Sequence, residues 1–162
     1  MKGFPKDILI IDFEVTGFDF KKDEPVQIGI ILLDKKTLEE KKSFVSWIKP
    51  KQELNIELPG FKWANIREQE IQEIENAPDE NTVAKKINDL LPDEYILSAW
   101  NVTFDYVFWN KILSHLNKSI HAAKLLDLWT LAQVNLLKDE SYNGNYDSES
   151  VFQHFGAKPR EK

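Results

Sequence analysis

The sequence contains no cysteine, and this absence excludes several kinds of site at once. A chain without cysteine has no disulfide framework, no zinc–thiolate centre and no cysteine nucleophile. No apolar run approaches the roughly 20 residues that cross a bilayer. Residues 1–7 carry charges where a secretory signal has an apolar stretch. We therefore expect a cytoplasmic protein with no membrane association.

Glycine and proline are also scarce, at six and seven residues, which excludes a fibrous or low-complexity chain. A hydrophobic content of 42% over 162 residues is enough for one folded domain with its own core. The chain lacks the basic excess typical of proteins that coat nucleic acid, since 21 basic and 27 acidic side chains give a formal charge of −6. Clustered metal-binding carboxylates beside a local basic groove would produce the same total, so the charge alone does not exclude a nucleic-acid substrate.

The hydrophobic pattern predicts three strands followed by helices and shorter strands. The first three strands, predicted as a β-meander, are residues 8–13, 26–33 and 43–48. Helical spacing is found at residues 66–74, 81–91, 104–116, 128–137 and 148–155, and short strands at 95–99 and 125–126. Residues 54–63 show no regular pattern and include a Pro-Gly turn signal. We expect one α/β domain over residues 1–162, with helices flanking a mixed sheet.

Two carboxylates stand at the end of the first predicted strand, in residues 12–17 (DFEVTG). Asp12 and Glu14 are two positions apart, so a strand projects them from the same face. They repel each other unless a cation or protons lie between them, and hard oxygen ligands suit Mg²⁺ or Mn²⁺. An ordinary solvated strand end is the alternative. The apolar residues that precede Asp12 place the pair at the edge of a core.

A second polar segment, residues 99–105 (AWNVTFD), follows a predicted strand and opens a helix. Asp105 falls in the first helical turn, where the helix dipole favours negative charge. Simple capping by Asn101 or Thr103, with Asp105 as an accessory acid, would explain the segment without any function. A position beside Phe104 would, however, half-bury the Asp105 carboxylate, which then needs a partner.

Together, the two segments resemble those of the DEDD superfamily of 3′–5′ exonucleases. The resemblance rests on Asp-x-Glu-x-Thr-Gly followed by Asn-x-x-Phe-Asp, in that order and each on the expected element. The flanking pattern resembles the DEDDh-type proofreading branch, typified by the epsilon subunit of bacterial DNA polymerase III and by ribonuclease T. The resemblance covers almost the whole chain and implies a ribonuclease-H-like fold. It also implies a metal-dependent exonuclease that hydrolyses phosphodiester bonds at the 3′ ends of single-stranded DNA or RNA.

The resemblance also assigns roles to individual residues. It implies that Asp12, Glu14 and Asp105 converge as the catalytic residues and bind two Mg²⁺ or Mn²⁺ ions, which would activate water and stabilise the leaving oxygen. It implies substrate-binding roles for Val15, Thr16, Gly17, Asn101 and Phe104. The partners it implies are single-stranded 3′ ends and a polymerase or repair complex.

Aromatic residues in predicted loops are candidates to stack on nucleobases. Phe18, Phe61 and Trp63 fall in such segments. The other tryptophans are predicted to belong mostly to the core.

The third motif of the family, a histidine followed a few residues later by an aspartate, has no match in this sequence. His115, His121 and His154 all lack an aspartate at that spacing. We expect each of them to be a surface or packing residue. We also expect residues beyond Lys162 to supply the missing histidine and fourth carboxylate.

Two alternatives remain open. One is a catalytically inactive nucleic-acid-binding or scaffold module with the same fold. The other is a nuclease that takes its fourth carboxylate from Asp127 or Asp147, although Asp127 is placed to cap the helix that follows it.

Overall fold

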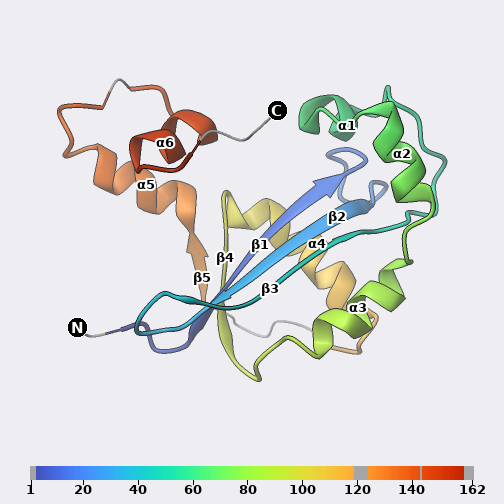
Figure 1. The fold of residues 1–162 in the computed structure, drawn as a ribbon, viewed down its shortest axis with the longest axis horizontal. Coiled ribbons are helices and arrows are strands. Elements are labelled where there is room, and N and C mark those ends of the chain that lie inside the picture. The colour runs from blue at the N-terminus through green and yellow to red at the C-terminus, as the bar shows by residue number, and fades with distance from the viewer. Residues whose placement is uncertain (1–2, 119–123, 143, 159–162) are drawn as a thin grey trace.

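The computed structural model describes residues 3–118, 124–142 and 144–158, and within these ranges the chain forms one mixed sheet flanked by helices (Figure 1). An antiparallel meander comprises β1 (Asp7–Val15), β2 (Pro25–Leu33) and β3 (Glu40–Trp47). Two shorter strands join it in parallel on the other side of β1, namely β4 (Tyr95–Ala99) and β5 (Leu125–Asp127). The sheet order is β3-β2-β1-β4-β5, so β1 lies at its centre.

The helices lie between and after these strands. They are α1 (Pro59–Ala64), α2 (Glu68–Glu75), α3 (Glu80–Asn88), α4 (Val102–Ser114), α5 (Leu128–Leu136) and α6 (Ser148–His154). In Figure 1, α1 lies near the C-terminal end of β1, whereas α5 and α6 lie beyond β5. None of the helices in the described ranges is long and apolar enough to span a bilayer.

The main core forms between β1 and α4. In β1, Ile11, Phe13 and Val15 are at most 3% exposed, and they belong to the same cluster as Phe108 and Trp109 of α4. Alternate residues of a strand face opposite sides, so this burial turns the intervening Asp12 and Glu14 to the other side of β1. The core thus fixes the direction in which the two carboxylates project.

The predicted meander and all five predicted helices are confirmed, with ends shifted by a few residues, but residues 54–63 differ from the prediction. The segment includes α1, a helix that begins at Pro59 because proline is well suited to the first helical position. Phe61 in this helix is fully buried, in a cluster with Val26 and Ile74. The prediction that Phe61 stacks on a nucleobase is therefore wrong.

Candidate active site

A crevice opens where two parallel strands part. Residues 7–10 of β1 pair with residues 95–98 of β4, and the pairing stops before the carboxylate-bearing end of β1. The backbone N–H of Phe13 donates instead to Oδ1 of Asp105 in α4, at 3.1 Å. Ligands of open α/β sheets bind in crevices at the carboxyl ends of such strands. One buried hydrogen bond thus links the two sequence segments, through residues that are 92 positions apart in the chain.

Asp105 is only 3% exposed, which is unusual for an aspartate. Burial, and next the negative charge of Asp12, raise the pKa of its carboxyl from the ordinary 3.8 to about 8. The Phe13 N–H acts in the opposite direction, and the charge of Glu14 adds a smaller upward effect. The carboxyls of Asp12, Glu14 and Asp105 therefore act on one another electrostatically, and a neutral Asp105 is the favoured form at neutral pH.

The donor chemistry of this group fits a divalent cation. Asp12 is exposed and Glu14 half-buried, and carboxylate oxygens are the ligands that Mg²⁺ and Mn²⁺ prefer. A cation beside Asp105 would offset both causes that raise its pKa, because it replaces lost hydration and neutralises the neighbouring charges. Within the described residues, however, no three Asp, Glu or His side chains are grouped closely enough to form a ready-made metal site. The roles of the three acids as metal ligands stay a prediction.

The turn after β1 is held by its own side chains. Thr16 is fully buried, and its hydroxyl donates to Oδ1 of Asp23 and accepts from the backbone N–H of Glu24, each at 3.0 Å. At Gly17 a Cβ would lie 2.5 Å from Oδ2 of Asp23, so a larger residue there would displace the Asp23 carboxylate. In the structure these two residues shape the loop that carries Phe18.

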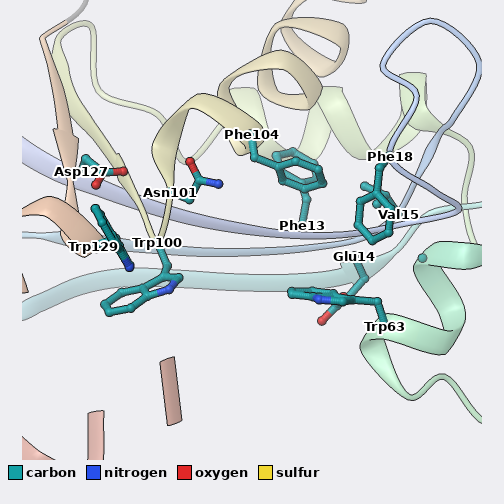
Figure 2. A pocket seen from close by; sticks show the side chains of 11 residues that line it. Phe13, Glu14, Val15, Phe18, Trp63, Trp100, Asn101, Phe104, Asp127 and Trp129 are labelled. Carbon is teal, nitrogen blue, oxygen red and sulfur yellow. The ribbon is translucent and has the colours of Figure 1, made fainter. Parts of the chain in front are cut away.

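Beside the carboxylates lies a cavity of about 610 Å³ with a largely aromatic wall (Figure 2). Trp63 reaches it from α1 on one side, and Trp100 and Trp129 reach it from the other side, next to β5. The full set of lining residues is Phe13, Glu14, Val15, Phe18, Gly60, Trp63, Trp100, Asn101, Phe104, Asp127 and Trp129.

Four of the predicted site residues line this cavity, namely Glu14, Val15, Asn101 and Phe104. The other four, Asp12, Thr16, Gly17 and Asp105, are not among its lining residues. Of the aromatic residues predicted to stack on bases, Phe18 and Trp63 are 47% and 70% exposed and lie edge to face, with ring centroids 6.1 Å apart.

Sequence reasoning missed Trp100 and Trp129 as lining residues, because it placed most tryptophans in the core. Trp129 is in fact 43% exposed. The sequence did contain a signal for their place at the cavity, since each of the two tryptophans closely follows the C-terminal end of a predicted strand. The polar segments also lie at the C-terminal ends of predicted strands. Only the sheet order, which brings β4 next to β5, places the two tryptophans together.

Gly60 joins α1 to the end of β1. Its backbone N–H donates to the carbonyl oxygen of Thr16 at 3.1 Å, and a Cβ would collide with the carbonyl oxygen of Val15. Because two backbones meet here, Gly60→Ala should lower the free energy of unfolding by about 1–3 kcal/mol, as measured by urea titration. Gly29→Ala is the matched control, because its Cβ would meet only an atom 4.0 Å away. Equal stability of the two variants would contradict the close packing of α1 on β1.

The two described histidines are engaged away from this cavity. His115 bonds Glu80 of α3, and His154 bonds Asp139, each at 2.8 Å. Both findings agree with packing or surface roles. His121 lies outside the described residues.

Both alternative carboxylates cap helices. Asp127 accepts from the N–H of Thr130 at 2.7 Å, which confirms the predicted cap of α5, and from the N–H of Val102 at 2.8 Å. Asp147 accepts from the N–H and the hydroxyl of Ser150, both at 2.8 Å. We therefore assign neither carboxylate to a metal.

Comparisons with known proteins agree with this geometry. The family model of the RNase_T exonucleases matches residues 9–153. The 3′-5′ exonuclease DinG of Staphylococcus aureus (strain USA300) is 30% identical over 135 residues, which are 82% of this chain and 14% of DinG. The chain thus spans a small part of that relative.

Solved structures share the fold. E. coli exonuclease I in complex with a dT13 oligonucleotide superposes with a TM-score of 0.71 at 19% identity, over 91% of this chain and 35% of that one. A zinc-bound form of the E. coli exonuclease I–ssDNA complex gives the same TM-score, identity and coverage. The predicted α/β fold of the ribonuclease-H-like kind is confirmed. On the evidence of the family model, the chain belongs to the RNase_T family of exonucleases.

Proposed function

We propose that this chain is the catalytic domain of a metal-dependent 3′–5′ exonuclease that acts on single-stranded DNA or RNA. The observation that carries the proposal is the buried Asp105 carboxyl, which accepts the Phe13 N–H and lies under the electrostatic influence of Asp12 and Glu14, the last of which lines the aromatic cavity. A protein has little reason to place three mutually repelling acids beside a ligand-sized cavity unless a cation or proton joins them. The names of DinG and exonuclease I support the same activity.

In this proposal Asp12, Glu14 and Asp105 hold two Mg²⁺ or Mn²⁺ ions. When bound, the ions supply an activated water and stabilise the charge on the leaving oxygen. The chain itself orients the substrate: Glu14 and Val15 lie along the strand edge of the cavity, and Asn101 and Phe104 lie along its helix edge. Asp105 would have to be deprotonated to hold a cation, so metal affinity would depend on pH.

The aromatic wall fits an unpaired nucleotide end. Every base has a π face, so stacking on Trp63 or Phe18 binds single strands with little sequence preference. A base held in a duplex cannot reach such a wall without unstacking. The proposed substrates are therefore single-stranded 3′ ends, presented by a polymerase or a repair complex.

Degradation of labelled oligonucleotides tests the proposal. The full-length protein, with Mn²⁺ or Mg²⁺, should release mononucleotides stepwise from the 3′ end of a 5′-labelled single strand and should stop on addition of EDTA. Degradation rates measured side by side on DNA and RNA oligonucleotides of the same sequence show whether the enzyme prefers deoxyribose or ribose. Oligonucleotide binding without turnover at every metal concentration would instead favour the catalytically inactive binding module, the alternative motivated by the unmatched third motif.

Trp63 gives a test of base stacking. Trp63→Ala should weaken binding of a single-stranded oligonucleotide roughly tenfold, because stacking is worth about 1–3 kcal/mol per base. The side chain is 70% exposed, so its loss should change the melting temperature little. Trp63→Phe, which keeps a ring, is the control and should restore most of the affinity in a fluorescence anisotropy titration. Wild-type affinity for Trp63→Ala would exclude this wall from the binding site.

A further inference from the structure

The N-terminus of α4 lacks the cap that its own residues would normally supply. Asn101 occupies the capping position, but its backbone is left-handed, with φ 64° and ψ 62°, and its side chain makes no capping hydrogen bond. A capping asparagine ordinarily has extended backbone and bonds the first free N–H groups of the helix. At α4 a different residue accepts the first free N–H group.

Asp127 supplies the missing cap from the neighbouring strand. Its Oδ2 accepts the N–H of Val102, the first residue of α4, while its Oδ1 accepts the N–H of Thr130 in α5. Against the upward effect of burial, these hydrogen bonds lower the pKa of Asp127, so the carboxylate stays ionised. One side chain at the end of β5 thus holds the first turns of two helices.

The Asn101 amide is consequently available for another use. Its Oδ1 accepts from the Thr103 hydroxyl at 2.9 Å, which leaves the Nδ2 group as a donor, and the exposed side chain lines the aromatic cavity (Figure 2). Figure 2 places Asn101 between Asp127 and Phe104, on the side where α4 begins. Asp105 follows within the same first turn.

We propose that Asp127 is a positioning residue of the active site, which caps α4 in place of Asn101 and so lets the Asn101 amide donate to an oxygen of the bound nucleotide. The inference rests on the proposed function, because it requires a nucleic-acid end in the cavity. An asparagine at the start of α4 would otherwise have to cap the helix and contact the substrate with the same side chain, and the proposal divides these two roles between two residues. Asp127 holds the backbone turn, and Asn101 contacts the substrate.

A double-mutant cycle tests the inference. Binding of a thymidine oligonucleotide is followed by tryptophan fluorescence, since Trp63, Trp100 and Trp129 line the cavity. Asn101→Gly keeps the left-handed backbone and removes the amide, and it should weaken binding about tenfold, the effect of one lost hydrogen bond. Asp127→Ala should weaken binding by a similar factor. The double variant should bind no worse than either single variant, because the two substitutions remove the same contact.

The matched control is Asp79→Ala, which removes the cap of α3 through Thr82. It should lower the melting temperature as Asp127→Ala does, yet leave the oligonucleotide affinity within about twofold of wild type. If Asp127→Ala does not fold, Asp127→Asn keeps one acceptor oxygen and should show an intermediate loss of affinity.

The outcomes separate the inference from the proposed function. Wild-type affinity for Asp127→Ala, or losses that multiply in the double variant, would overturn the positioning role while the wild-type protein still binds the oligonucleotide. A wild-type protein that binds no single-stranded oligonucleotide with Mg²⁺, Mn²⁺ or Ca²⁺ would overturn the proposed function, and the inference with it.

Discussion

Replacing Asp12 by alanine is expected to lower the rate of mononucleotide release by on the order of a thousandfold or more, because a metal ligand acts on the charge that develops in the transition state. The side chain is exposed at the end of a strand whose core-facing neighbours are Ile11 and Phe13. Its removal therefore leaves the packing intact, and the melting temperature should stay close to that of the wild type. Initial rates on a 5′-labelled single strand with Mn²⁺ measure the effect.

Asp7 provides the matched control for this experiment. It lies at the other end of the same strand, where its carboxylate bonds Lys41 at 2.8 Å and the backbone N–H of Lys35 at 3.0 Å. Asp7→Ala should lower the melting temperature and leave the rate unchanged. If Asp12→Ala keeps more than about a tenth of the wild-type rate, Asp12 is not a metal ligand, and the carboxylate pair is the ordinary strand end considered as an alternative.

The oligonucleotide affinity of Asp12→Ala helps to distinguish a catalytic domain from a catalytically inactive binding module. Loss of a negative charge beside the proposed site for the nucleic-acid backbone should keep the affinity or raise it. A variant that binds normally but does not cut identifies a catalytic centre. If the wild-type protein also binds the oligonucleotide without cutting it, the domain is a binding module.

Local patterns predicted much of this molecule. Residues 12–17 and 99–105 are recognisable because alternation and helix capping act over a few residues, and the structure joins the two segments through Asp105 and Phe13. The meander was predictable for the same reason. The sheet order and the early end of the β1–β4 pairing were not, because they depend on contacts between distant segments.

The residues that prediction misplaced show the same limit. Phe61 was taken for a loop residue because a Pro-Gly pair usually marks a turn, whereas Pro59 begins a helix that buries the ring. Trp129 was taken for a core residue because tryptophan is mostly buried, whereas it faces the cavity. Burial of a single aromatic residue depends on which elements pack beside it, and a sequence pattern does not contain that information.

Asparagine at position 105 should stabilise the metal-free protein and remove its activity. The folded protein holds the Asp105 carboxyl at a pKa of about 8, well above the ordinary 3.8. A group with a raised pKa takes up a proton on folding. The contribution of Asp105 to the free energy of unfolding is therefore most favourable below its unfolded pKa, and it is lost as the pH rises through about 8. Asparagine is always neutral and can still accept the Phe13 N–H through its carbonyl oxygen.

We therefore expect Asp105→Asn to unfold with a free energy roughly 2–4 kcal/mol higher than wild type at pH 8, and with almost no difference near pH 4. Urea titrations in EDTA at several pH values measure this. Asp34→Asn is the control: backbone N–H groups of Lys36 and Thr37 lower the pKa of that partly exposed carboxyl, so its neutralisation should bring no gain. A loss of stability for Asp105→Asn at pH 8 would show that the buried carboxylate is favourable without a cation.

Metal titration tests whether a bound cation needs the Asp105 carboxylate. Mn²⁺ should raise the melting temperature of the wild type, and more steeply as the pH rises from 6 to 8, because binding must displace the proton from Asp105. Asp105→Asn should show little of this increase, although it starts from a more stable metal-free state. The Asp105 carboxyl would then lower the stability of the metal-free protein and also be required for cation binding. Such a loss of stability in return for activity is expected of a buried acid that is part of an active site.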